Sequence, residues 1–146
     1  MIAHRVMGKQ PGGVKMKIIR NDLAQIVRRA RKAAGNDGRE IVGLLIHNGR
    51  FLEILETRNI SKKSGCFQYD ARQIKAIVKA ARELDHRIMG TFHSHPAAFA
   101  RPGECDIKGA VDDSLMLIID CIAREAKLWR IRDGKARRVP LDLIAV

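Results

Sequence analysis

The chain has 146 residues and a hydrophobic fraction of 46%, which suit one globular domain with a core of its own. Its apolar runs fall well short of the ~20 residues that span a bilayer, which argues against a membrane protein. A formal net charge of +12 predicts attraction to acidic partners or to nucleic acid.

The first predicted elements are a strand and a helix that follow a polar lead-in. Residues 1–13 are turn-rich and lack the apolar stretch of a signal peptide, so we expect a flexible N-terminal extension. The single domain is expected over residues 14–146, with its first strand at 14–19. Asn21 then offers a helix N-cap, and apolar residues at helical spacing continue to Gly35.

An apolar hairpin is predicted next. Residues 40–46 form a strand, and Asn48-Gly49 predicts a two-residue turn into a further strand over residues 51–55. The polar segment 59–69 is expected to be a loop that lines the functional site.

A second helix begins the other half of the chain. Asp70 and Gln73 have the spacing of a capping box and predict a helix that runs to Leu84. The later predicted elements are a strand at 87–92, a short helix from Asp106 to about Val111, a buried strand at 115–119, a strand at 127–132, and a last strand after the Asp133-Gly134 turn. Strands and helices mix without strict alternation, which predicts an α/β fold with a mixed sheet flanked by helices.

The strongest functional signal is the sequence His93-Ser94-His95-Pro96, which Asp106 follows at a distance of ten residues. Histidines at positions i and i+2 of a strand project to the same side. The turn-forming residues between Pro96 and Asp106 can bring the carboxylate back to the two imidazoles. Two imidazoles and one carboxylate suit zinc and leave a fourth position for water. Cys105 is not expected to be a ligand, because adjacent residues rarely both reach one ion.

Glu40 is the second chemical candidate. It is a lone carboxylate that opens an apolar run, where most acidic residues would be surface groups. A Glu beside a metal-activated water serves as the proton acceptor in hydrolysis. A lone His-x-His is usually a polar strand edge, but the added Pro96, the spacing to Asp106 and the upstream Glu40 favour a metal centre.

These residues resemble the JAMM (MPN+) metalloprotease family, whose pattern is a Glu on an early strand followed by His-(Ser/Thr)-His-Pro-x6-Ser-x2-Asp. The resemblance covers most of the chain, and its compactness is similar to the prokaryotic branch. It implies that His93, His95 and Asp106 bind one zinc ion and that Glu40 activates the water. It also implies a three-layer α/β/α sandwich related to the cytidine-deaminase-like architecture, although the deaminase signature itself is absent.

One position departs from the family pattern. Gly103 stands where the family has a serine thought to help position the water or to stabilise the tetrahedral intermediate. Glycine leaves only a backbone N–H for that task, so the change affects the catalytic rate and leaves the metal ligands in place. Ser94 is expected to face away from the ligands and to have a secondary, hydrogen-bonding role.

The resemblance implies a zinc-dependent metallopeptidase or isopeptidase, a deubiquitinase-like enzyme. It would cleave after the C-terminal glycine of ubiquitin, a ubiquitin-like modifier or a sulfur-carrier protein. Activating and conjugating enzymes of the same pathway are further expected partners. A catalytically silent MPN scaffold that binds protein partners remains an alternative because of Gly103. A nucleic-acid-associated protein with a related fold is another, although that branch usually has Asn where this chain has Ser94.

Charge and cysteine content bear on partners and location. Basic residues gather in two places: Arg28, Arg29, Arg31 and Lys32, and later Arg130, Arg132, Lys135, Arg137 and Arg138. With aromatic residues at only 4%, base-stacking platforms are scarce, so an acidic protein partner is favoured over nucleic acid. Three cysteines without paired spacing predict reduced thiols and a cytoplasmic protein.

Overall fold

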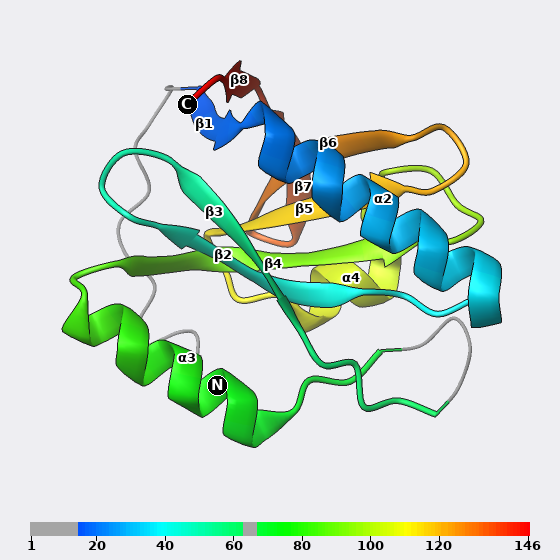
Figure 1. Ribbon diagram of the computed structural model, residues 1–146, viewed down its shortest axis with the longest axis horizontal. Coiled ribbons are helices and arrows are strands. Elements are labelled where there is room, and N and C mark those ends of the chain that lie inside the picture. Colours follow the sequence, from blue (N-terminus) through cyan, green and yellow to red (C-terminus); the bar gives the residue numbers. More distant parts are fainter. Residues whose placement is uncertain (1–14, 63–66) are drawn as a thin grey trace.

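The computed structural model describes residues 15–62 and 67–146, so the expectation for residues 1–13 lies outside the described residues. The described part of the chain forms three helices and eight strands, and Figure 1 shows how they are arranged. In chain order they are β1 (Met16–Ile19), α2 (Arg20–Asp37), β2 (Val42–His47), β3 (Leu52–Thr57), α3 (Ala71–Glu83), β4 (Arg87–His95), α4 (Glu104–Gly109), β5 (Ser114–Asp120), β6 (Glu125–Arg132), β7 (Lys135–Val139) and β8 (Leu141–Ile144).

Six strands form one mixed sheet in the order β3-β2-β4-β5-β6-β7. The central pair, β4 and β5, is parallel, and the other neighbours are antiparallel. β1 and β8 form a separate parallel pair. The mixed sheet was predicted, whereas β8 and its pairing with β1 were not, because parallel partners at the two ends of a domain leave no local signal.

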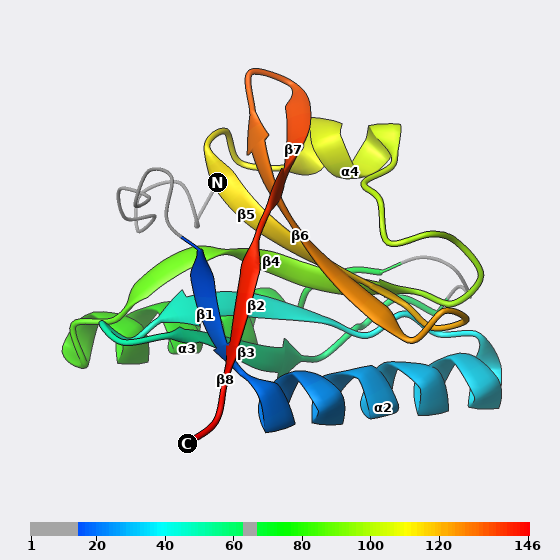
Figure 2. The same cartoon turned by 90° about the horizontal axis from the view of Figure 1, so that it is seen from above.

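The helices cover both faces of the sheet. Ile26 and Ala30 of α2 belong to a core cluster that includes Leu45 and Leu117 on one face. α3 packs on β2 and β4 through a second cluster on the other face, and α4 packs on β5 and β6 through a third. Figure 2 shows α2 and α4 on opposite sides of the sheet. The predicted three-layer α/β/α sandwich is therefore confirmed.

Some predicted boundaries were wrong at the ends of elements. α2 begins at Arg20, without the expected Asn21 cap, and passes through Gly35 to a left-handed cap at Gly38 (φ 68°). The hairpin connection between β2 and β3 spans four residues, because His47 is paired with Leu52.

Two other local predictions were closer. The carboxylate of Asp70 accepts hydrogen bonds from the N–H groups of Arg72 and Gln73, which is one half of the predicted capping box. The other half was wrong, because Oε1 of Gln73 accepts from the N–H of Arg58 instead. Asp133 and Gly134 both have positive φ (52° and 71°), which is the backbone of the expected two-residue turn between β6 and β7.

An irregularity in β4 decides which side chains reach the functional face. Leu45 is paired with Gly90 and Ile46 with Ile88, so Met89 is an extra residue in β4. Ile88 faces α3, whereas Met89 packs into the α2 cluster. Strict alternation from Ile88 would turn the even-numbered residues toward α3. The extra residue shifts the alternation by one, so beyond Met89 the odd-numbered residues of β4 face the α3 side instead.

Among the described cysteines, Cys105 is an exposed free thiol and Cys121 a buried one. Cys66 lies outside the described residues. No helix in the described ranges has the length and apolar character needed to cross a bilayer.

Candidate metal centre

Three donor atoms converge where β4 ends. The side chains of His93 and His95 share one face of the strand, and their Nε2 atoms are 3.0 Å apart. Asp106 comes from the first turn of α4, and its Oδ2 lies 3.4 Å from Nε2 of His93 and 3.6 Å from Nε2 of His95. The loop between β4 and α4 thus returns the carboxylate to the histidines.

Each of the three candidate metal ligands has a contact that fixes the orientation of its side chain. Nδ1 of His95 donates to the carbonyl oxygen of Phe99 at 2.7 Å, which leaves Nε2 with its lone pair toward the other donors. The ring of Phe67 stacks on His93, with centroids 5.1 Å apart. The N–H of Gly103 donates to Oδ2 of Asp106 at 2.8 Å. The three donors are therefore held in place by their surroundings.

The spacing of the donors suits a tetrahedral metal ion. Metal–ligand bonds of about 2.0–2.1 Å in a tetrahedron place neighbouring ligand atoms about 3.3–3.4 Å apart. The observed separations of 3.0, 3.4 and 3.6 Å bracket that value. Donor atoms of Glu40, His93 and His95 also lie within 4.8 Å of one another. The residues present therefore fit a zinc ion, with Glu40 beside it.

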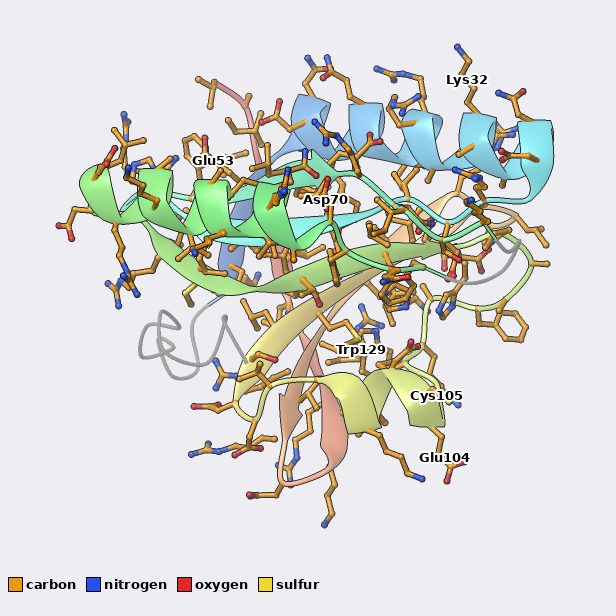
Figure 3. The ribbon with its side chains drawn as sticks, turned by 90° about the horizontal axis from the view of Figure 1, so that it is seen from below. Lys32, Glu53, Asp70, Glu104, Cys105 and Trp129 are labelled. Atoms are coloured by element: carbon orange, nitrogen blue, oxygen red, sulfur yellow. The ribbon has the colours of Figure 1, made fainter. Side chains whose placement is uncertain are left out.

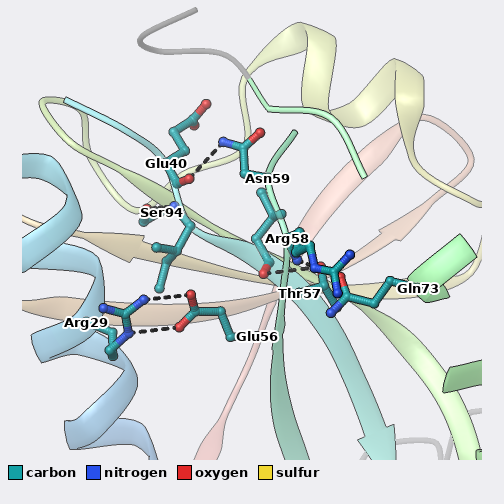
Figure 4. A network of polar contacts seen from close by, with 10 residues as sticks. Arg29, Glu40, Glu56, Thr57, Arg58, Asn59, Gln73 and Ser94 are labelled. Atoms are coloured by element: carbon teal, nitrogen blue, oxygen red, sulfur yellow. Dashed lines mark hydrogen bonds and ion pairs between the residues drawn. The ribbon is translucent and has the colours of Figure 1, made fainter. Parts of the chain in front are cut away.

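Glu40 is 8% exposed and lies two residues before the first residue of strand β2. The Oγ of Ser94 accepts a hydrogen bond from the N–H of Ile41 at 2.8 Å, and the N–H of Ser94 donates to the carbonyl of Ile41 at 3.0 Å. On the other side, Nδ2 of Asn59 donates to the carbonyl of Glu40 at 2.9 Å. Figure 4 shows Glu40 between Asn59 and Ser94. Hydrogen bonds on two sides therefore hold the backbone that carries the carboxylate of Glu40.

The environment of Glu40 changes its acidity. Burial raises its pKa to about 7, while the charge of His95 lowers that pKa and the charge of Asp106 raises it. A carboxyl group that titrates near neutrality can both accept and return a proton at physiological pH.

The pKa values of Asp106 and His95 shift in opposite directions. Burial alone would raise the pKa of Asp106, but hydrogen bonds from His93 and His95, together with the charge of His93, hold it well below its usual range. The hydrogen bond to Asp106 raises the pKa of His95, against the effect of burial. Asp106 is therefore the permanent anion of the site.

The structure places every residue expected at the site within one region. Ser94 is fully buried and points away from the ligands, toward Ile41. Gly103 is the N-cap of α4, which begins at Glu104 and not at Asp106. Its N–H is used by Asp106, so the backbone group that could replace the missing hydroxyl already has a partner. Cys105 is exposed on α4, as Figure 3 shows, and is not among the converging donors of the described residues.

Sequence reasoning missed the residues that support the ligands. Phe67 and Asn59 come from the loop that was expected to line the site, but no motif singled them out. Tyr69 is a further member of that loop, and its hydroxyl donates to the carbonyl of Gly43 at 3.4 Å. Burial raises the pKa of Tyr69 to about 12, so it stays neutral. The one sequence signal for their roles was their position in a loop between two predicted elements.

The mixed α/β/α sandwich, with paired histidines at the end of its central strand β4, matches the class of JAB/MPN domains. The family of prokaryotic homologs of the JAB domain matches residues 20–132, more than half of the chain. The chain belongs to this family, and the resemblance seen in its sequence is confirmed. No curated protein matches it.

Two solved structures share the fold. The solution structure of a protein from Desulfitobacterium hafniense has a TM-score of 0.75 at 24% identity and covers 90% of this chain and 94% of its own. A JAB1/MPN domain protein from Archaeoglobus fulgidus has a TM-score of 0.54 at 19% identity, with coverages of 88% and 98%. Both matches span nearly the whole described domain.

Proposed function

We propose that this chain is a zinc-dependent metallopeptidase or isopeptidase that cleaves after the C-terminal glycine of a ubiquitin-like or sulfur-carrier protein. The observation that carries the proposal is the convergence of His93, His95 and Asp106 beside the buried carboxyl group of Glu40. A scaffold that only binds partners has no need for a buried carboxyl group beside such a set of metal-ligating atoms.

The chemistry follows from the donors. When bound, zinc supplies the Lewis acidity that activates water and the scissile carbonyl. Glu40 accepts a proton from the attacking water while the water oxygen bonds to the carbonyl carbon. The carbon–nitrogen bond then breaks, and Glu40 returns the proton to the leaving amine. Ser94 and Asn59 keep the carboxyl group in position, because they hold the backbone on either side of it.

The partner is proposed from charge. The outward face of α3, a helix whose N-terminal end borders the cavity beside the metal centre, carries four exposed basic residues: Arg72, Lys75, Lys79 and Arg82. Ala71 and Ile74 of the same helix line the cavity beside His93. A modifier with an acidic docking face would meet this helix while its extended C-terminus enters the site. Activating and conjugating enzymes of the same pathway remain proposed partners.

The test is cleavage of a modifier fused to a short C-terminal extension. We expect release of the extension by the zinc-loaded protein, and loss of release with a chelator or in Glu40→Gln. The matched control is Glu104→Gln, which removes an exposed carboxylate on α4 and keeps zinc. Release that survives both the chelator and Glu40→Gln contradicts the mechanism. A protein that holds zinc but cleaves no fusion or isopeptide conjugate is a silent scaffold.

A further inference from the structure

A cavity of about 630 Å³ opens directly beside the metal centre. His93 and Asp106 belong to its wall, so a substrate group at the metal also faces the cavity. Leu44 and Met116 of the sheet, with Ile74 of α3, give it a largely apolar lining. The volume lies in the range of sites that enclose small organic groups.

The cavity exists because α3 and α4 do not meet. On this face of the sheet the two helices pack into separate clusters of the described residues. Three of the residues that line this space are small, namely Ala71, Gly109 and Ala110. A Cβ atom added at Gly109 meets no atom within 4 Å. Small residues therefore border part of the gap, and the Cβ of a larger side chain at Gly109 would meet no clash.

We propose that this cavity receives a bulky apolar side chain of the substrate residue that directly follows the scissile bond. The inference rests on the proposed cleavage after glycine. Because glycine has no side chain, it cannot fill a cavity beside the scissile carbonyl, and the nearest side chain to the scissile bond is that of the residue on the leaving side. The preferred substrate is a modifier with a linear extension that begins with a large aliphatic or aromatic residue. An extension that begins with a charged residue would lose its hydration against this lining.

Binding measured apart from turnover tests the cavity. Mercaptoacetyl-leucinamide and mercaptoacetyl-glycinamide both offer a thiolate to zinc, and they differ only in the side chain that follows. Calorimetry on the zinc-loaded protein should show about 10- to 100-fold tighter binding of the leucine compound, the usual gain from burying such a side chain. Equal affinities of the two compounds would overturn the proposal.

Two glycine variants show where the side chain binds. Gly109→Leu should fill the cavity and reduce the leucine-to-glycine affinity ratio toward one, with zinc content retained. Gly35→Leu is the matched control, because Gly35 lies in α2 on the opposite face of the sheet and its added Cβ also meets nothing within 4 Å. The control should keep the full ratio. A ratio that survives Gly109→Leu places the leucine outside the cavity and refutes the proposal.

A cleavage experiment separates this inference from the proposed function. Fusions in which glycine is followed by leucine or by aspartate should differ at least tenfold in cleavage rate. If both are cleaved equally, the proposed function stands and the inference fails. If neither is cleaved but the thiol compounds still show the ratio and its loss in Gly109→Leu, the cavity assignment stands and the function fails. A ratio that appears only after residues 1–14 are deleted would identify that segment as the occupant instead.

Discussion

The buried carboxyl group of Glu40 should make the metal-free protein lose stability as the pH rises. The folded pKa of about 7 exceeds the ordinary value of 4.5. The folded state therefore binds the proton more tightly than the unfolded state does. Its contribution to stability is fully present below pH 4.5 and is lost as the pH rises through 7. At about 1.4 kcal/mol per pKa unit, the shift corresponds to roughly 3 kcal/mol.

Glu40→Gln removes this titration and keeps the shape of the side chain. The variant should match the wild-type protein more closely at pH 5 and exceed it by up to roughly 3 kcal/mol at pH 8, both without metal. His95 and Asp106 titrate in both proteins, so their effects largely cancel in the difference.

Urea unfolding of chelator-treated protein at several pH values measures the difference. The control is Glu104→Gln, which makes the same change at an exposed side chain on α4. Added zinc should reduce the wild-type loss at high pH, because a cation stabilises the ionised carboxylate. A difference between Glu40→Gln and wild type that does not change with pH would refute the reasoning.

Four further outcomes are expected. Asp106→Ala should lose stoichiometric zinc in elemental analysis, and the zinc-dependent rise in thermal midpoint should disappear with it. Gly103→Ser adds a Cβ at an ordinary 3.5 Å from Oδ2 of Asp106, so zinc should be retained and cleavage should rise by up to about 100-fold; a large fall would contradict this. Ser94→Ala leaves the buried N–H of Ile41 without its acceptor and should cost about 1–3 kcal/mol in unfolding experiments, together with a lower kcat. Gly90→Ala would put a Cβ 1.8 Å from the carbonyl oxygen of Leu115 and should cost more than about 4 kcal/mol, whereas Gly109→Ala should be well tolerated.

Local chemistry explains which parts of the fold were predictable from the sequence. The α3 cap depends on Asp70 and on backbone groups two and three residues away, and the β6–β7 turn depends on two adjacent residues. Both signals lie within a few positions of the chain. The β1–β8 pair joins residues more than a hundred positions apart, and nothing in either short segment specifies the other. The sequence therefore predicted the layers better than it predicted the pairing at the ends of the chain.

The residues of the candidate site also divide into those that local sequence predicts and those that depend on contacts distant in the chain. The spacing of His93, His95 and Asp106 is local, so the motif pointed to all three. Phe67 and Asn59 act through contacts with residues 26 and 19 positions away, on other elements. Their identities are common in loops, and their roles depend on where the loop ends up in space. Supporting residues of this kind become visible only when the sheet brings them beside the motif.

The bulge at Met89 determines which side chains of β4 reach the metal centre. It turns Phe92 and Ser94 toward α2 and the odd-numbered positions toward α3 and α4. The side chains of β4 that alternate to one face of the sheet are the histidines at the metal centre. The side chain between them, on the opposite face, is the serine whose hydroxyl holds the backbone next to Glu40. A strand without the extra residue would bury the histidines under α2 and turn the serine toward the cavity. The spacing of the motif is therefore sufficient for a metal site only in a strand whose register is set by that bulge.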